Sequence, residues 1–395
     1  MEDWKDYKIG DICSKVCSGG TPSSKHTEYY DGNIPWLNTK EINFNRIFCT
    51  EKCITEEGLN NSSAKWIEEN SVIVAMYGAT AGKTAIAKIP LTTNQACCNL
   101  TINHSVADYR FVYYYLSYKF IELASLANGG AQQNLNAQII KDFEINLPSL
   151  HEQELIANVL SSLDDKIEVN RRINDNLEQQ AQALFKSWFV DFEPFKNGEF
   201  VESELGMIPK GWRVYKLSEF LPVITGKKDA NVAQGGNYPF FSCSQDYGWT
   251  DSYSFEGNAI LVAGNGDFNV KMYNGKFEAY QRTYVLIPYN PLYTAWLFYA
   301  VKFHLDEITS AARGSVIKFI TKGNLADFQF AAPAQLDALN IIIKFDSIRR
   351  MIATNNYQSR RLAELRDTLL PKLMSGELKV TNMDLVNEML EKGIR

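Results

Sequence analysis

The chain contains two copies of one pattern, and this internal repeat constrains its fold more than any other feature of its 395 residues. Trp4-Lys-Asp-Tyr-Lys-Ile is matched in the second half of the chain by Trp212-Arg-Val-Tyr-Lys-Leu. Four pairs of segments are similar in this way: residues 4–9 with 212–217, 32–36 with 236–240, 71–75 with 258–262, and 141–148 with 326–333. Similarity in the same order along the chain indicates a tandem duplication. We therefore expect two similar domains, each with its own core.

The first part of each copy predicts a strand-rich domain. Short β-rich runs alternate there with glycine, asparagine and proline, which is typical of strands joined by turns and long loops. Long loops on a rigid sheet suit recognition, although any single loop can also serve only as a connection. We predict an α+β fold in which two similar strand-rich domains are separated by two long helices. The predicted domains are residues 1–150, a central helix region at 151–200, residues 201–332, and a C-terminal helix region and tail at 333–395.

Each copy ends in about 40 residues with helical periodicity, after Pro148 and after Pro333. Spacings of four and three residues alternate in both regions, and this is the seam of a coiled coil. The first seam consists of Leu163, Ile167, Asn170, Asn174, Leu177, Ala181, Leu184 and Trp188. The second, which follows the first at a constant offset, consists of Ile348, Ile352, Asn355, Ser359, Leu362, Arg366, Leu369 and Leu373. Packing the two helices against each other, in parallel or antiparallel orientation, is the simplest way to bury both seams.

An antiparallel pairing centred near Asn174 and Leu362 places apolar residues opposite one another at both ends. The polar seam residues then collect in the middle, with Asn170 near Arg366, where they can fix the register at some loss of stability. Pro371 removes a backbone donor, so we expect the second helix to bend or end there. An antiparallel coiled coil is therefore one hypothesis for the two helices, beside a parallel one.

Composition and charge exclude several classes of protein. The net charge is −6, and residues 151–200 carry ten acidic against five basic residues, which argues against a protein that coats nucleic acid indiscriminately. No run of about 18 apolar residues occurs, and the first residues lack the features of a signal peptide. We predict a cytoplasmic protein that does not span a membrane. Its seven cysteines are an odd number and are expected to be thiols.

The cysteines and histidines do not predict a metal site. Two CxxxC pairs, Cys13 with Cys17 and Cys49 with Cys53, lack the tighter spacing usual in structural zinc sites. The second copy has no cysteines at the matching positions. We expect these residues to be small buried thiols. The four histidines show neither metal-ligand spacing nor a nucleophile partner.

The sequence resembles a known family, the DNA-specificity subunits of type I restriction-modification systems. The resemblance spans essentially the whole chain, and the order of its elements, the duplication and the paired helices together make it specific. The elements are Trp4–Gly10 followed by Gly19-Gly-Thr-Pro22, Gly32-Asn-Ile-Pro-Trp36, Thr93-Asn-Gln-Ala-Cys97, Asn146-Leu-Pro-Ser-Leu150, and Leu369-Leu-Pro-Lys-Leu-Met-Ser-Gly-Glu-Leu378.

This resemblance implies two target recognition domains, related by a pseudo-twofold axis, that each read one half of a bipartite double-stranded DNA site. It also implies two helical regions that pack as an antiparallel coiled coil, act as a spacer and dock two methyltransferase subunits. It implies no catalytic site and no cofactor on this chain. Adenine methylation and ATP-dependent cleavage would belong to methyltransferase and restriction subunits, which would bind S-adenosylmethionine, ATP and Mg²⁺. About 26 residues of seam span roughly 40 Å. This length is comparable with the roughly 34 Å of one duplex turn that separates half-sites in dimeric readers, so the helices could set the spacing.

Two motifs resemble catalytic signatures but depart from them. Tyr77-Gly-Ala-Thr-Ala-Gly-Lys-Thr84 resembles a phosphate-binding loop, but three residues separate its glycines where the pattern has four. We predict a DNA-facing loop there, with Thr80 and Lys83 as candidate contacts. Asn290-Pro-Leu-Tyr293 resembles the Asn-Pro-Pro-Tyr motif of adenine methyltransferases without its second proline. We expect a turn before an aromatic helix instead.

Candidate DNA contacts lie in loops of both copies. The amide-rich segment 129–134 suits adenine, because Gln and Asn can bond two adjacent major-groove atoms of that base. Its counterpart at 312–318 is basic and suits guanine or phosphate. The candidate DNA-binding residues are Thr21, Ser23, Lys25, Thr80, Lys83, Gln132, Gln133 and Asn134 in the first copy, and Lys227, Lys228, Asn265, Arg313 and Lys318 in the second. For Lys227 and Lys228 we predict phosphate contact, and ordinary solvated side chains are the alternative.

The acidic helix region would repel phosphates, so we expect it to face a protein. Trp188, Phe189 and Phe192 near its end are candidate partner-binding residues, because they offer apolar anchors. Two other classes of function stay open. One is a free-standing methyltransferase or nuclease, which the incomplete motifs disfavour. The other is a scaffolding protein whose helices bind partners while its domains do not touch DNA.

Overall fold

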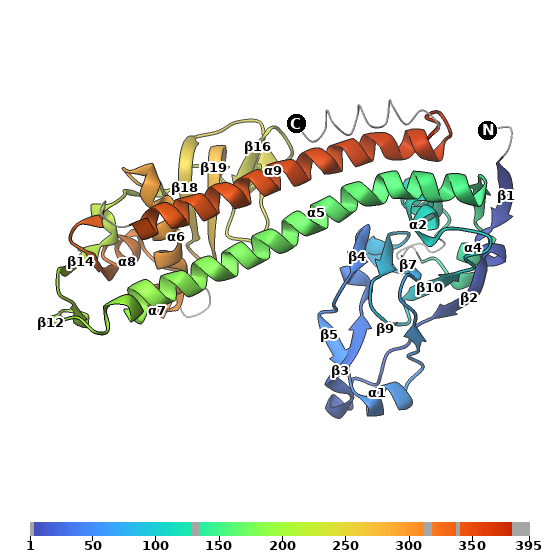
Figure 1. Cartoon of the computed structure of the whole chain (residues 1–395), viewed down its shortest axis with the longest axis horizontal. Coiled ribbons are helices and arrows are strands. Elements are labelled where there is room, and N and C mark those ends of the chain that lie inside the picture. The colour runs from blue at the N-terminus through green and yellow to red at the C-terminus, as the bar shows by residue number, and fades with distance from the viewer. Residues whose placement is uncertain (1–3, 128–133, 311–317, 337–339, 381–395) are drawn as a thin grey trace. The chain divides into compact units, whose positions relative to one another are not determined.

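The computed structural model describes residues 4–127, 134–310, 318–336 and 340–380 (Figure 1). The chain divides into two compact units. Unit 1 comprises residues 1–169 and 358–395, and unit 2 comprises residues 170–357. Each unit therefore contains one part of each long helix. The predicted domains differ, because they assigned each helix to a region of its own. No helix within the described ranges is long and apolar enough to cross a membrane.

Unit 1 contains a five-stranded sheet with the strand order β2-β10-β7-β8-β4. Its strands are β2 (Cys13–Ser18), β10 (Cys97–Ile102), β7 (Val72–Ala75), β8 (Thr84–Ala87) and β4 (Asn45–Ile47). All neighbours are antiparallel except β4 and β8. The central strand β7 is buried along its whole length, with Val72 and Val74 in one apolar cluster and Ile73 and Ala75 in another. Burial on both faces explains its continuous apolar sequence.

The rest of the first copy completes unit 1 around this sheet. A four-stranded sheet has the order β5-β3-β9-β6, and β1 pairs with β11. These strands are β5 (Lys52–Ile54), β3 (Tyr30–Leu37), β9 (Leu91–Thr93), β6 (Trp66–Ile67), β1 (Lys5–Lys8) and β11 (Glu144–Leu147). The short helices are α1 (Glu56–Asn60), α2 (Tyr109–Tyr118), α3 (Phe120–Ser125) and α4 (Ala137–Asp142). The Asp108 side chain caps α2 by accepting the backbone N–H groups of Arg110 and Phe111.

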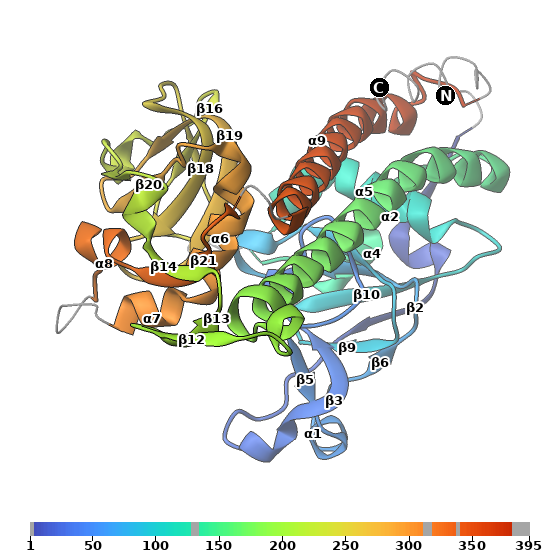
Figure 2. The same ribbon diagram turned by 60° about the vertical axis from the view of Figure 1, so that its left-hand side comes forward.

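Unit 2 is organised around a six-stranded sheet with the order β15-β20-β18-β19-β16-β17. Its strands are β15 (Val223–Thr225), β20 (Thr283–Leu286), β18 (Phe255–Ala263), β19 (Val270–Ala279), β16 (Tyr238–Phe241) and β17 (Gly248–Thr250). The other elements are β12 (Phe200–Ser203), β13 (Gly206–Pro209), β14 (Trp212–Lys216), β21 (Gln329–Pro333), α6 (Thr294–Phe303), α7 (Leu305–Ser310) and α8 (Lys322–Ala326). Figure 2 shows α6 against β18 and β19.

The structure confirms the duplication in detail. The similar segments at the start and end of each copy pair with each other in the same way: β1 with β11 in unit 1, and β14 with β21 in unit 2, both antiparallel. The aromatic helices α2 and α6 begin and end at equivalent positions of the two copies. Most residues of both helices are buried, and the side chains of Phe111 in α2 and Trp296 in α6 are fully buried. The predicted α+β fold is therefore correct.

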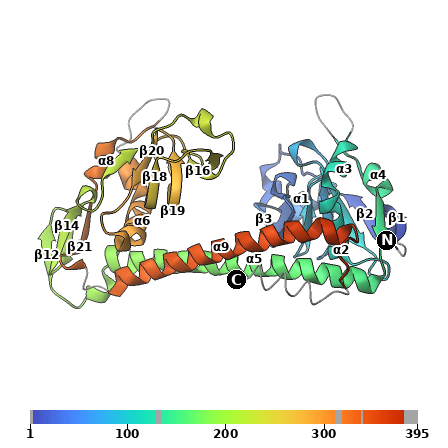
Figure 3. The same cartoon turned by 90° about the horizontal axis from the view of Figure 1, so that it is seen from above.

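The two long helices, α5 (Leu150–Phe185) and α9 (Asn340–Met374), pack antiparallel. In unit 2, the Asn355 amide donates to Asn174 Oδ1 at 2.8 Å. Further along α5 and closer to the start of α9, the rings of Phe185 and Phe345 lie 6.3 Å apart. The residue numbers thus rise along one helix as they fall along the other, as Figure 3 shows. The antiparallel orientation was predicted correctly.

The predicted register of this pairing is wrong by about one heptad. Asn174 meets Asn355, which lies two helical turns before the predicted partner Leu362. In unit 1, Arg366 Nη1 donates to Asp164 Oδ1 at 2.7 Å instead of meeting Asn170. The polarity of the seam residues does not reveal this register, because Asp164 lies beside the seam and is not one of its positions. Pairing Arg366 with this carboxylate and amide with amide satisfies the polar groups that would otherwise be buried without partners.

The ends of both helices differ from the predicted seams. A single turn of π-helix, Lys186–Val190, follows α5 and adds a residue to the turn. Phe189, within this turn, and Phe185, the last residue of α5, lie in the core of unit 2, whereas Leu184 and Trp188 lie at its margin. In α9 the helix continues through Pro371 to Met374, and Leu373 is fully buried in the core of unit 1. The predicted end at Pro371 is therefore wrong, and the predicted bend stays a prediction.

We expect Phe189→Ala to destabilise the protein much more than Trp188→Ala. Phe189 is 6% exposed and its ring lies 5.7 Å from those of Trp212 and Trp296. Truncation should cost about 3–5 kcal/mol of unfolding free energy, because it leaves a cavity. Thermal unfolding followed by circular dichroism measures both variants. Equal destabilisation by the two substitutions would contradict this packing.

Equivalent tyrosines attach α5 to each unit. Tyr114 of α2 donates its hydroxyl to Asp164 Oδ2 at 2.5 Å. Tyr299, at the equivalent position of α6, donates to Glu178 Oε2 at 2.7 Å, and Lys302 also donates to Glu178. Burial by itself raises the pKa of Glu178, but these hydrogen bonds outweigh it and leave the pKa below its ordinary value.

The contribution of Glu178 to stability should depend on pH. Because the folded-state pKa is lowered, the stabilisation is complete above the ordinary value of 4.5 and is lost as the pH falls through the folded value. Glu178→Gln should lower the unfolding free energy by about 1–2 kcal/mol at pH 7, and the difference from the wild type should shrink below pH 4.5. Urea titrations between pH 3 and 7 measure it. Glu154→Gln, an exposed position on the same helix, is the control.

Candidate nucleic-acid interface

Four strand ends of the five-stranded sheet in unit 1 meet at one edge. The last residues of β2 and β7 and the first residues of β10 and β8 are neighbours, as the pairs Cys98 with Ser18 and Val74 with Thr84 show. In an antiparallel sheet, the loops that leave these ends must emerge on the same side. The segments 19–25, 76–83 and 94–96 therefore lie along a single edge, which we call edge 1.

The first loop of edge 1 is held close to the sheet by two glycines. Gly20 donates its backbone N–H to Thr93 O at 2.8 Å. A Cβ atom on Gly19 would lie 2.1 Å from the same oxygen, so only glycine permits this approach. Beyond it, the predicted contacts Thr21, Ser23 and Lys25 are all exposed. The Thr21 hydroxyl donates to Gln95 Oε1 and ties this loop to segment 94–96.

The second loop brings two separately predicted segments together. Tyr77 forms an isolated antiparallel bridge with Asn134, and Leu135 donates its N–H to Met76 O at 2.8 Å. Asn134 thus joins edge 1, whereas Gln132 and Gln133 lie outside the described residues. Gly78 has a φ of +69° with nothing within 4 Å of an added Cβ, so it forms an open, projecting turn.

Thr80 and Lys83 of this loop are partly engaged within the protein. Lys83 is half-buried and donates to Asn43 Oδ1 at 2.8 Å, and Thr80 donates to Tyr77 O at 3.3 Å. Both remain predictions as DNA contacts. The loop leads into strand β8 and not into a helix, so it lacks the helix N-terminus that a phosphate-binding loop uses. That the loop is not a nucleotide site stays a prediction.

Unit 2 has a matching edge, edge 2, where β15 and β18 end and β20 and β19 begin. Lys227 and Lys228 follow β15 and are exposed, although the Lys227 amine lies 5.2 Å from the Phe255 ring centroid. Asn265 forms a bridge with Phe319, next to the exposed Lys318. Arg313 lies outside the described residues.

Residues that the sequence analysis did not select also lie on these edges. Gln95 is exposed on edge 1, and Gln281 and Arg282 are exposed on edge 2. Arg282 and Gln281 line a hollow of about 390 Å³ together with Phe319 and Tyr284. The repeat could have revealed the glutamines, because Gln95 and Gln281 stand in corresponding segments of the two copies.

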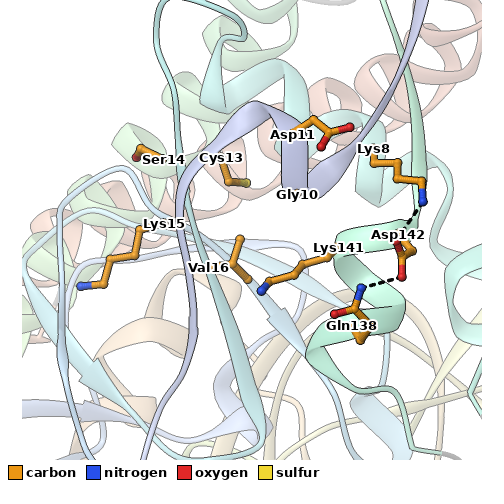
Figure 4. Close-up of a pocket in the computed structure, with 10 residues that line it drawn as sticks. All are labelled: Lys8, Gly10, Asp11, Cys13, Ser14, Lys15, Val16, Gln138, Lys141 and Asp142. Carbon is orange, nitrogen blue, oxygen red and sulfur yellow. Dashed lines mark hydrogen bonds and ion pairs between the residues drawn. The ribbon is translucent and has the colours of Figure 1, made fainter.

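An open hollow of about 350 Å³ lies between residues 8–16 and α4 (Figure 4). Lys8 pairs with Asp142 at 3.0 Å, and Gln138 donates to the other carboxylate oxygen at 2.7 Å. Burial raises the pKa of the Cys13 thiol to about 12, so it is protonated at neutral pH and is a poor nucleophile. Cys13 therefore does not give this hollow an activated nucleophile.

Three further predictions concern metal ligands, the burial of the cysteines and the turn at Asn290. Among the described residues, no group of three or more His, Cys, Asp or Glu side chains is placed to hold a metal. Cys49 is exposed, so the expectation of a buried thiol is wrong there, while Cys13, Cys17 and Cys53 are partly buried. Asn290 caps a turn of 3-10 helix directly before α6, as expected of a turn preceding the aromatic helix.

The candidate partner-binding residues lie largely inside unit 2. Phe189 belongs to its core, so the prediction that it offers an exposed anchor is wrong. Trp188 and Phe192 are only partly exposed and pack edge-on against Phe195 and Trp212, with centroids 5.7 and 5.2 Å apart. The π-helical turn and the left-handed conformation of Phe192, with a φ of 52°, direct this segment back onto the unit.

The chain matches a family model described as the type I restriction modification DNA specificity domain over residues 1–179 and 209–359. It is 31% identical to the type I restriction enzyme MjaIX specificity subunit of Methanocaldococcus jannaschii, across 97% of this chain and 95% of that protein. It is 35% identical to the EcoDI specificity subunit of Escherichia coli, across 44% of this chain and 40% of that protein.

A solved structure of a type I restriction-modification system S subunit from M. genitalium has a similar fold, with a TM-score of 0.60 and 17% identity over 94% of this chain and 96% of that one. The family model matches both copies, and the M. jannaschii relative aligns over nearly its full length. The chain therefore belongs to the DNA-specificity subunits of type I restriction-modification systems.

Proposed function

We propose that this chain reads a bipartite, asymmetric DNA site, with edge 1 contacting one half and edge 2 the other. The observation that carries the proposal is that both edges have the same backbone plan but different side chains. The Tyr77–Asn134 bridge of edge 1 corresponds to the Asn265–Phe319 bridge of edge 2. Two readers with different side chains recognise different sequences, so the site need not be a palindrome.

The chemistry of the edges suits DNA. Asn134 and Asn265 carry amides that can bond base edges. The exposed lysines Lys25, Lys228 and Lys318 suit phosphate oxygens, and such contacts fix the position of a protein on the duplex without reading its sequence. Local basic residues of this kind are compatible with the overall charge of −6.

The long helices have two roles in this proposal. As a spacer, they set the gap between the half-sites, because a continuous helix of 36 residues such as α5 is a stiff element. As a docking surface, they bind two modification methyltransferase subunits. Apolar side chains exposed on α5 and α9 replace the buried Phe189 as candidate anchors: Val169, Ile173, Ile343, Met351 and Tyr357, exposed by 46%, 40%, 50%, 52% and 63%.

In this proposal the chain is not an enzyme. The methyltransferase subunits bind S-adenosylmethionine and methylate adenine, and the restriction subunits use ATP and Mg²⁺ for cleavage. Two observations support this division: the loop that resembles a phosphate-binding motif leads into a strand, and the Asn290 motif forms a helix cap. Methyl transfer by the purified chain alone would contradict it.

Deleting the gene for this chain should remove N6-methyladenine from one bipartite motif with a fixed gap. Single-molecule sequencing of the genome, with and without the chain, measures this without an assumed target. Restoring the wild-type chain should restore the motif. If a reconstituted complex with active methyltransferase subunits methylates no such motif, the proposed function is wrong.

Exchanging residues 76–83 and 134–136 for those of another specificity subunit should change the half of the motif read by edge 1 and leave assembly with methyltransferase subunits intact. The exchange replaces base-facing side chains but preserves the strands that carry them. Methylation mapping and analytical ultracentrifugation measure the two effects. An unchanged motif in an assembled, active complex would favour a scaffold that does not read DNA.

Lengthening both helices should lengthen the gap in the recognised site. One heptad inserted after Asn174 and another after Asn355 adds about 10 Å to the helix pair at roughly 1.5 Å per residue. This corresponds to up to about three base pairs of duplex at roughly 3.4 Å each. Methylation mapping should show both half-sites unchanged and a longer gap between them. An unchanged gap would contradict the spacer role.

A further inference from the structure

The two recognition edges share a network of four backbone hydrogen bonds, which makes their positions directly comparable. Gly20 to Thr93 and Met76 to Ala96 on edge 1, both 2.8 Å, correspond to Lys227 to Ala279 at 3.0 Å and Gly264 to Arg282 at 2.8 Å on edge 2. The other two are Gly19 to Cys97 with Gly226 to Thr283, and Leu135 to Met76 with Ile320 to Gly264.

This network places Gln95 and Gln281 at the same position. Gln95 stands between the acceptor residues Thr93 and Ala96, and Gln281 stands at the same place between Ala279 and Arg282. Both glutamines are exposed. Around the glutamines, the two edges carry different residues at nearly every equivalent position. For example, Lys228 on edge 2 stands at the position that Thr21 occupies on edge 1.

On each edge, the glutamine is held by a hydrogen bond to a neighbouring loop. This loop follows β2 on edge 1 and β15 on edge 2. Thr21 donates its hydroxyl to Gln95 Oε1 on edge 1. On edge 2, Gln281 donates its backbone N–H to Lys228 O at 2.9 Å and its side-chain Nε2 to Asp229 Oδ2 at 3.5 Å. Since Nε2 carries two hydrogens, each side chain keeps at least one N–H donor that can face a ligand.

We infer that Gln95 and Gln281 are positioning residues that donate to the phosphate backbone of the two half-sites, while the differing residues around them read the bases. This inference rests on the proposed function. Two half-sites of unlike sequence have the sugar-phosphate backbone in common, so a side chain common to both readers matches that shared feature. Side-chain amides are regular donors to phosphate oxygens.

The fixed amides are poorly suited to reading adenine instead. Bidentate recognition of adenine uses the oxygen and the nitrogen of one amide together. To read adenine, Gln95 would have to share its oxygen with the Thr21 hydroxyl, and Gln281 would have to share its nitrogen with Asp229. A single N–H donor remains sufficient for a phosphate oxygen, and it carries no information about sequence.

The test uses the complete complex of this chain with its methyltransferase subunits and a duplex that carries the methylated motif. Gln95→Ala and Gln281→Ala should each weaken binding about tenfold, to the specific duplex and to a duplex of unrelated sequence alike. Because glutamine is uncharged, the slope of log affinity against log salt should stay unchanged, whereas Lys228→Ala should reduce it by about one. Fluorescence anisotropy over a salt series measures all of these.

Further variants separate a lost contact from a lost fold. Gln95→Glu keeps the acceptor for Thr21 but replaces the donor with a negative charge, so it should weaken binding more than Gln95→Ala. Gln335→Ala, at an exposed glutamine after β21, should leave binding unchanged. Thermal unfolding of every variant should match the wild type within the shift expected for an exposed position.

The outcomes are distinguishable. An unchanged methylation motif with weaker binding to both duplexes supports the inference. Relaxed specificity at one base of a half-site in a glutamine variant means that the residue reads that base and overturns it. Unchanged affinity in both alanine variants also overturns it. If the wild-type complex methylates no bipartite motif, the proposed function itself is refuted. That outcome does not depend on the glutamine variants.

Discussion

Neither unit of this protein can complete its core with residues of its own copy. Unit 1 buries Leu362, Leu369 and Leu373, which belong to the helix of the second copy. Unit 2 buries Ala181 and Phe185, which belong to the helix of the first. Apolar burial is the largest stabilising term in folding, so pairing α5 with α9 is a condition for both cores. The pairing is therefore a structural requirement of each domain, and not only a link between them.

The polar contacts of α5 show how the duplication has diverged around this requirement. Tyr114 and Tyr299 are equivalent, and both donate to a carboxylate on α5. The carboxylates themselves are not equivalent: Asp164 also binds Arg366 of α9, whereas Glu178 binds Lys302 of α6. A partly buried carboxylate needs such partners, because burial without them disfavours its charged form. Tyr114 thus docks on the helix of its own copy and Tyr299 on the helix of the other copy, and the two contacts use different ion pairs.

The parts of the structure that follow from periodicity were predictable from the sequence, and the parts set by tertiary contacts were not. The duplication, the strand-rich domains and the antiparallel helices were all correct. The helix register was wrong because Asp164 lies beside the seam and could not be recognised as the partner of Arg366. The burial of Phe189 depends on a π-helical turn that shifts the helical period. For the candidate site, loops of both edges were selected from the sequence, but Gln95 and Gln281 became visible only when backbone hydrogen bonds aligned the two edges.

In the proposed function, the two edges would let such a protein change its target without losing its fold. The backbone bonds and the close approaches of Gly19 and Gly226 to the neighbouring strand, where an added Cβ would lie 2.1 Å from a carbonyl oxygen, hold the edges in place. None of these interactions involves the side chains of Tyr77, Asn134 or Asn265. Substitutions at those loop positions change the surface offered to DNA, while the apolar cores and the helix pairing that stabilise the domains stay the same. In this proposal, specificity and stability therefore reside in different residues, and each can vary without the other.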